Sequence, residues 1–213
     1  MSKRDIAIIG TGGMAREVRW VIEESKNNEQ WNILGWVSKE KPGTLIAGLP
    51  VLGDDDWLLE RDKPIDVVVS VGSGALRKKI VSYLKQNPNI SFPSIIADSA
   101  EVSNYVRIGE GAIIMNKSLL TVDITVGDFF LCNYGCTVGH DCRFEDYVTL
   151  NPGARLSGGL HVCEGATIGV GASIKQQLKI GKESFVGAGA VVVKDVDDNI
   201  TVVGVPAKKL EKR

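Results

Sequence analysis

Histidine is scarce in this chain, whose 213 residues include only two, His140 and His161. Three histidines around a zinc ion, an arrangement found in some β-helix proteins, therefore cannot form here. The four cysteines contain no Cys-x-x-Cys pair, so neither a zinc ribbon nor a redox dithiol is expected. We therefore predict no metal ligands.

Long apolar runs and an excess of one charge are also missing. No apolar stretch approaches the roughly 18 residues that a membrane span needs, so we expect no membrane insertion. The formal net charge is -1, which gives no reason to expect a nucleic-acid partner. The sequence shows no secretion signal, and unpaired cysteines suit the reducing cytoplasm, where we place the protein.

Tryptophan is absent after residue 57, although the first 57 residues contain four. Glycine and β-branched residues dominate the chain after about residue 100. A shift of this kind marks a boundary between domains. We therefore divide the chain into an N-terminal domain, residues 1–93, and a C-terminal domain with its tail, residues 94–213.

A period of six residues runs through the C-terminal domain, because every sixth residue from Ile96 to Val192 is apolar. We number each hexad from this apolar residue; a small or apolar residue often takes the fifth position. Such a period suits neither an amphipathic helix nor a hairpin sheet, and it predicts a solenoid of short strands joined by tight turns. Glycines at second positions are expected to supply the turn dihedrals, as at Gly109, Gly127, Gly139, Gly169, Gly181 and Gly187.

The hexads resemble those of the left-handed β-helix acyltransferases, in which three hexads form one triangular coil. The resemblance implies an all-β parallel prism, in which the hexads make five to six coils. The register from Ile96 to Asp197 needs no insertion, so no long loop should project from the prism. Cys132 is a first position, while Cys136 and Cys142 are fifth positions. We expect these cysteines to fill the prism as small hydrophobic residues.

His140 is the third residue of its hexad, at a turn that faces outward. Residues 18 apart stack on successive coils, so its expected neighbours are Val122 and Gly158, and Gly158 leaves space beside the ring. Because an imidazole can accept a proton in the physiological pH range, we predict that His140 is a general base. Asp141 either orients the ring or is a solvated turn residue, and the sequence leaves both open.

The N-terminal domain shows an alternating α/β pattern. DIAIIG predicts a buried strand, and Gly10, Gly12 and Ala15 fit G-x-G-x-x-A, a turn whose backbone amides hold phosphate before a helix. NILGWVS and DVVVSVGS predict further strands, ALRKKIVSYLKQN predicts a helix, and DDDW at 54–57 predicts a capped helix start. This Rossmann-like half-domain is too short for NAD and favours a mononucleotide or sugar nucleotide.

The whole chain resembles the bacterial sugar acetyltransferases that include sialic acid O-acetyltransferases and UDP-4-amino-sugar N-acetyltransferases. The resemblance rests on the Gly turn, the hexads, the Asn133…His140-Asp141-Cys142 segment, NPGARLSGG at 151–159 and GVPAK at 204–208. It implies an acetyl-CoA-dependent homotrimer of surface-glycan biosynthesis, with active sites between adjacent β-helices. It makes His140 the base and Asp141 its carboxylate partner.

The same resemblance assigns the remaining site residues. It places CoA against the outward turns at Val170 and Ala188, Thr149 at the acetyl-CoA contact, and Lys208 among the lysines near the CoA phosphates. For each lysine taken singly, a role in surface solubility explains the residue at least as well as phosphate binding does. The residues expected to contact the sugar or nucleotide are Gly10, Gly12, Gly13, Met14, Ser38, Gly72 and Asn133.

Three positions depart from the family pattern. Met14 replaces a histidine of the Gly turn, Ser38 and Lys39 replace paired acids of the UDP-binding members, and Thr149 replaces a second histidine that contacts acetyl-CoA. We therefore expect UDP to bind weakly or the nucleotide to differ. The acylated atom, nitrogen or oxygen, stays open, as do a sialic-acid-type O-acetyltransferase and a non-catalytic β-helix scaffold. The short α/β half argues against a nucleotide-dependent oxidoreductase.

Overall fold

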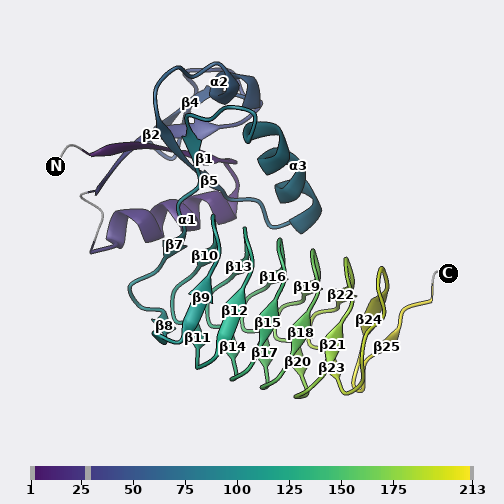
Figure 1. Cartoon of the computed structure of the whole chain (residues 1–213). Coiled ribbons are helices and arrows are strands. Elements are labelled where there is room, and N and C mark those ends of the chain that lie inside the picture. Colours follow the sequence, from purple (N-terminus) through teal and green to yellow (C-terminus); the bar gives the residue numbers. More distant parts are fainter. Residues whose placement is uncertain (1–2, 27–29, 212–213) are drawn as a thin grey trace. The chain divides into compact units, whose positions relative to one another are not determined.

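The computed structural model describes residues 3–26 and 30–211, and the chain divides into two compact units, residues 1–95 and 96–213. The first unit is α/β and the second is a left-handed parallel β-helix, as the sequence predicts. Figure 1 shows both units, with elements labelled where there is room. No helix among the described residues is long and apolar enough to cross a membrane.

A six-stranded sheet forms the first unit, in the order β3-β4-β2-β1-β5-β6. Parallel pairing places β1 at its centre, between β2 and β5. The elements, in chain order, are β1 (Arg4–Ile9), α1 (Gly13–Glu24), β2 (Trp31–Val37), β3 (Leu45–Ile46), β4 (Leu49–Gly53), α2 (Asp55–Leu59), β5 (Ile65–Val69), α3 (Gly74–Leu84) and β6 (Ile90–Ser91).

The predicted elements of this unit are confirmed, and one hairpin was not expected. β3 and β4 pair antiparallel, and the buried Trp36 donates a hydrogen bond from Nε1 to the Ile46 carbonyl at 2.8 Å. Helix α3 begins where the Ser73 side chain accepts a hydrogen bond from the Leu76 N–H. Helix α2 also starts at the acidic run, but the Asp54 side chain makes no capping hydrogen bond.

Three parallel sheets form the faces of the β-helix. We call them the long, middle and short faces, because they contain eight, six and five strands. The long face comprises β7 (Ile95–Ile96), β10 (Ile113–Ile114), β13 (Leu131–Cys132), β16 (Thr149–Leu150), β19 (Thr167–Ile168), β22 (Phe185–Val186), β24 (Thr201–Val203) and the antiparallel β25 (Lys208–Lys209). The middle face comprises β8 (Glu101–Val102), β11 (Leu119–Leu120), β14 (Thr137–Val138), β17 (Arg155–Leu156), β20 (Ser173–Ile174) and β23 (Val191–Val192). The short face comprises β9 (Val106–Ile108), β12 (Ile124–Val126), β15 (Arg143–Phe144), β18 (His161–Val162) and β21 (Lys179–Ile180).

The chain therefore has three rows of turns, which we call corners. Residues 133–136, 151–154, 169–172 and 187–190 lie on the long–middle corner. Residues 139–142, 157–160 and 175–178 lie on the middle–short corner. Residues 127–130, 145–148, 163–166 and 181–184 lie on the short–long corner.

First and fifth positions of the hexads form the core of the prism, including Cys132, Cys136 and Cys142 as predicted. Ile96, the first residue of the series, is an exception because it is exposed, and its neighbour Ile95 is buried instead. The strand containing Ile96 has a neighbouring coil on one side only. The last coil also departs from the predicted register, since Val196 pairs with Ile180, a step of 16 residues rather than 18.

The second-position glycines do not supply the turn dihedrals, so that expectation was wrong. Positive φ instead recurs at fourth positions, such as Asp141 at 57° and Gly153 at 69°. A Cβ on Gly139 would lie 2.7 Å from the backbone nitrogen of Gly158 on the next coil. Glycine at the second position therefore permits close stacking of successive coils, not an unusual dihedral.

Candidate active site

His140 and Asp141 contact each other on the middle–short corner, between β14 and β15. His140 Nδ1 lies 2.7 Å from Asp141 Oδ2, and the two side chains are 67% and 66% exposed. Asp141 adopts a left-handed backbone conformation, with φ of 57°, at the turn that brings it beside the ring. Of the two alternatives left by the sequence, the structure shows the carboxylate in contact with the imidazole. The Nε2 atom is then the ring nitrogen that remains for proton transfer.

The His140 ring lies against Gly158 of the next coil. A Cβ built on Gly158 would approach the ring atoms Cε1 and Nε2 to 2.7 Å, so any larger residue would displace the imidazole. The turns are also tied together, because the Gly159 N–H donates to the His140 carbonyl at 2.7 Å and the Asp141 N–H donates to the Val122 carbonyl at 3.2 Å. The space predicted at Gly158 is thus occupied by the imidazole itself.

Val170 and Ala188 lie on the long–middle corner, as predicted, and both are exposed. The Gly189 N–H donates to the Val170 carbonyl at 2.8 Å, and the Gly153 N–H donates to the Tyr134 carbonyl at 3.1 Å. Tyr134, Pro152, Val170 and Ala188 therefore form one apolar row along this corner. Asn133 lies at the start of the row, where its Oδ1 accepts a hydrogen bond from the Tyr134 N–H.

The other two predicted CoA contacts lie elsewhere on the β-helix. Thr149, on the long face, is only 1% exposed. Lys208 is exposed on β25, which pairs antiparallel with β24. Within one chain, therefore, the structure places Val170, Ala188 and Asn133 on one corner, and His140 and Asp141 on a different corner.

A cleft of about 810 Å³ lies in the first unit, at the carboxyl ends of β1 and β2. It is lined by Gly10 and Ser38, two of the predicted substrate contacts, and by Lys39. Gly12, Gly13 and Met14 begin helix α1 beside it and are not among its lining residues. Gly72 lies near them, since a Cβ on Gly72 would be 3.9 Å from Met14 Sδ.

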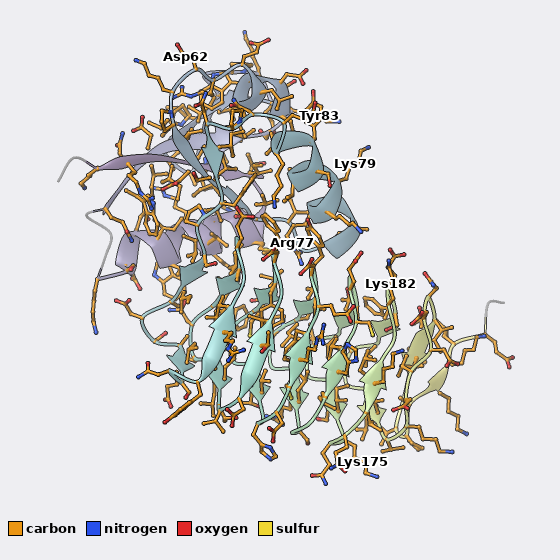
Figure 2. All side chains as sticks on the ribbon, in the orientation of Figure 1. Asp62, Arg77, Lys79, Tyr83, Lys175 and Lys182 are labelled. Carbon is orange, nitrogen blue, oxygen red and sulfur yellow. The ribbon has the colours of Figure 1, made fainter. Side chains whose placement is uncertain are left out.

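Sequence reasoning missed the acidic side of this cleft. Asp54, Asp55 and Asp56 line it together with Lys79 and Tyr83 of α3. Figure 2 shows Lys79 and Tyr83 projecting from that helix, and the Tyr83 hydroxyl donates a hydrogen bond to Asp56. The acidic run is visible in the sequence, where it predicts only a capped helix start and not a binding surface.

The Asp55 carboxyl, which lines the cleft, is perturbed by its surroundings. Burial, followed by the neighbouring Asp54 and Asp56 charges, raises the pKa of the Asp55 carboxyl above its ordinary value. Arg77 is buried in α3, and its Nη1 donates to the carbonyls of Val71 at 2.7 Å and Gly72 at 3.3 Å. This arginine holds the loop between β5 and α3 in place.

Known proteins match this chain in its N-terminal part and along nearly its whole length. Residues 5–84 match the PglD N-terminal domain family. GDP-perosamine N-acetyltransferase of Escherichia coli O157:H7 is 30% identical over 213 residues, with 96% of each chain covered.

Solved structures of acetyltransferases also match nearly the whole chain. A histidine variant of perosamine N-acetyltransferase from Caulobacter crescentus, in complex with CoA and GDP-perosamine, is 34% identical with a TM-score of 0.90, covering 98% of this chain and 97% of the other. The acetyltransferase domain of PglB from Neisseria gonorrhoeae FA1090, in complex with acetyl coenzyme A, is 32% identical with a TM-score of 0.90, covering 98% and 100%.

Proposed function

The chain belongs to the hexapeptide-repeat sugar acetyltransferases related to GDP-perosamine N-acetyltransferase, and we propose that it acetylates the amino group of a nucleotide-linked amino sugar with acetyl-CoA. The observation that carries this proposal is the exposed His140–Asp141 pair, in a chain that matches such an enzyme along its whole length. The proposed product is an N-acetylated sugar nucleotide that serves glycan assembly in a bacterium.

His140 is the general base in this proposal. The sugar amine attacks the thioester carbonyl, His140 Nε2 accepts the amine proton, the C–N bond forms and the C–S bond breaks. The same proton then passes to the departing CoA sulfur. Asp141 accepts a hydrogen bond from Nδ1–H, which fixes the tautomer and stabilises the imidazolium. Support also comes from relatives of known structure in which a histidine was replaced and both CoA and GDP-perosamine were bound.

The proposed path of CoA is the apolar row of Val170 and Ala188 on the long–middle corner. Because His140 lies on the middle–short corner, one chain cannot present both to the same substrate unless CoA crosses the middle face. A second copy packed beside the first would bring the two corners together. We therefore expect a homotrimer whose three sites are shared between neighbouring chains. Contacts of Thr149 and Lys208 with CoA stay predictions.

The cleft of the first unit is the proposed nucleotide site. Helix α1 has no side-chain cap at Gly12, and the first N–H groups of a helix have no partner within it, so this end favours a diphosphate. Lys39 and Lys79 add positive charge. A guanine base presents adjacent N–H donors, which a carboxylate can accept in pairs, and Asp54, Asp55 and Asp56 offer such carboxylates. We therefore place GDP ahead of UDP as the carrier.

Release of the CoA thiol with candidate acceptors tests this function. The acceptors are a GDP-linked 4-amino sugar, its UDP-linked counterpart and the free amino sugar, and mass spectrometry of the product identifies the acetylated atom. We expect turnover with the GDP-linked sugar and N-acetylation. Absence of thiol release with every amino sugar would favour the non-catalytic scaffold, and an ester product would favour the O-acetyltransferase.

Tryptophan fluorescence gives an independent measure of nucleotide binding. All four tryptophans lie in the first unit, and Trp57 lines a second cavity that shares Ser38, Lys39 and Asp54 with the cleft. GDP should therefore change the emission, whereas acetyl-CoA should leave it nearly unchanged. A tight response specific to UDP would return a UDP-amino sugar to first place.

A further inference from the structure

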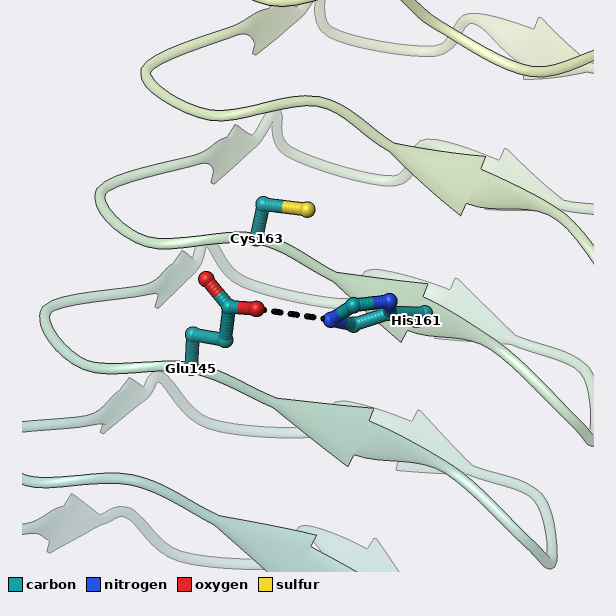
Figure 3. A group of neighbouring side chains, drawn as sticks. All are labelled: Glu145, His161 and Cys163. Carbon is teal, nitrogen blue, oxygen red and sulfur yellow. Dashed lines mark hydrogen bonds and ion pairs between the residues drawn. The ribbon is translucent and has the colours of Figure 1, made fainter.

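A second histidine cluster lies away from the candidate active site, on and beside the short face. It consists of Glu145, His161 and Cys163, whose potential ligand atoms all lie within 4.8 Å of one another. His161 is the outward residue of β18, while Glu145 and Cys163 hold equivalent second positions on successive coils of the short–long corner. Figure 3 shows the three side chains meeting on the outside of the prism.

The carboxylate and the imidazole of this cluster are already positioned. His161 Nε2 lies 2.8 Å from Glu145 Oε1, and the other oxygen of Glu145 accepts a hydrogen bond from the Glu164 N–H at 3.0 Å. One oxygen of Glu145 is thus fixed by the backbone and the other faces the ring. Both side chains remain partly exposed, at 34% and 42%.

Cys163 differs from the other three cysteines. The thiols of Cys132, Cys136 and Cys142 lie in the core of the prism and contact backbone carbonyls. Cys163 is 6% exposed but is outside that core cluster, and within residues 3–26 and 30–211 its Sγ has no hydrogen-bond acceptor. Cys163 is therefore a buried thiol that lies outside the core of the prism, beside His161 and Glu145.

We propose that Glu145, His161 and Cys163 bind a divalent transition-metal ion, with Zn²⁺ the best match. Oxygen, nitrogen and sulfur donors together suit a borderline ion such as zinc and not Mg²⁺ or Ca²⁺. Zinc bond lengths and tetrahedral angles place ligand atoms about 3.4–3.6 Å apart. The ligand atoms of the present cluster lie within 4.8 Å of one another, and His161 Nε2 lies 2.8 Å from Glu145 Oε1, so their separations span that range. A water would complete the fourth position.

Metal binding releases one proton and moves another. The ion displaces the thiol proton of Cys163, while the proton of the neutral His161 ring resides on Nδ1 so that Nε2 can bind the metal. The Glu164 N–H, followed by His161, lowers the pKa of Glu145, so this ligand is charged before the metal arrives. Protons and the metal compete for the Cys163 sulfur, so metal binding should weaken as pH falls.

The site would connect two successive coils and is separate from the acetyl-transfer residues. Glu145 belongs to one coil and the other two ligands belong to the next, so the ion cross-links the stack and stabilises the folded chain by mass action. Two basic side chains disfavour metal binding, because Arg143 and Lys179 flank His161 in the same row of the short face. The inference does not rest on the proposed function, since His140 lies on another corner.

Cobalt titration of the metal-free full chain tests the site. Co²⁺ bound by a cysteine thiolate gives a near-ultraviolet charge-transfer absorption band, and we expect this band to saturate at one ion per chain and to be displaced by Zn²⁺. Cys163→Ser should abolish the band, and His161→Ala should weaken Co²⁺ binding at least about tenfold. His140→Ala is the matched control and should bind Co²⁺ as the wild type does.

Two further results separate a specific site from incidental binding. Lys179→Met should tighten binding about fivefold, because it removes a nearby positive charge. Zn²⁺ should raise the melting temperature of the wild type but not of Cys163→Ser. A missing band, a band that survives in Cys163→Ser, or equal loss in His140→Ala would overturn the proposal. None of these readouts depends on acetyl transfer.

Discussion

The two units of this chain hold their functional residues in different ways. In the β-helix each position in the hexad has a fixed environment, so a residue's number nearly determines whether it faces the core, a face or a corner. In the α/β unit the cleft is formed by residues from the ends of β1 and β2, the start of α2 and one side of α3. In a repeat, the location of a site residue can therefore be predicted from its position in the sequence. In an open sheet, residues far apart in the sequence come together only on folding.

Removal of His140 should produce the largest effect. His140→Ala takes away the proposed base, so kcat should fall about 10²–10⁴-fold while the circular dichroism spectrum and the oligomeric state stay unchanged. Steady-state kinetics with the best acceptor measures this. Lys175→Ala is a suitable control, because Lys175 is exposed on the same corner. Equal losses in the two variants would contradict the role of His140.

Truncation of a side chain at a core position of the hexad should instead strongly lower the free energy of unfolding. Leu150→Ala removes a fully buried first-position side chain, so the free energy of unfolding should fall by about 2–5 kcal/mol. Thr137→Ser, at an exposed position of the middle face, should change it by less than about 0.5 kcal/mol. Chemical denaturation measures both. Similar losses would mean that the hexad position does not determine the environment.

Gly158→Ala should disturb the active site without removing a charged group. The new Cβ would overlap the His140 ring, which must move, and a displacement of about 1 Å typically costs roughly 10²-fold in rate. Ser157→Ala, at the exposed neighbouring position, should retain activity. Full activity in Gly158→Ala would show that the ring position seen here is not needed for catalysis.

The smallest effect should come from the acidic side of the cleft. Asp55 has a raised pKa in the folded chain, so the folded state loses stability as pH rises through that pKa and the charge forms. Asp55→Asn should therefore raise the melting temperature at pH 7 and leave it unchanged well below the ordinary value of 3.8.

The same variant should bind GDP more weakly if Asp55 accepts hydrogen bonds from the base. Tryptophan fluorescence measures this binding, and thermal unfolding at the two pH values measures stability. A variant that is more stable and binds GDP as tightly as the wild type would remove Asp55 from the nucleotide site.

The sequence by itself determined the β-helix, the Gly turn before α1 and the outward position of His140. These follow from a strict period of six and from local strand–turn–helix patterns, which depend on neighbours along the chain. Only the tertiary structure decided that Asp141 contacts the ring, because adjacency leaves the side-chain direction open. It also decided that second-position glycines permit close stacking of coils, that acids from α2 line the cleft, and that Glu145, His161 and Cys163 meet on successive coils. Each of these depends on contacts between segments well separated in sequence or on side-chain geometry, which composition and periodicity do not specify.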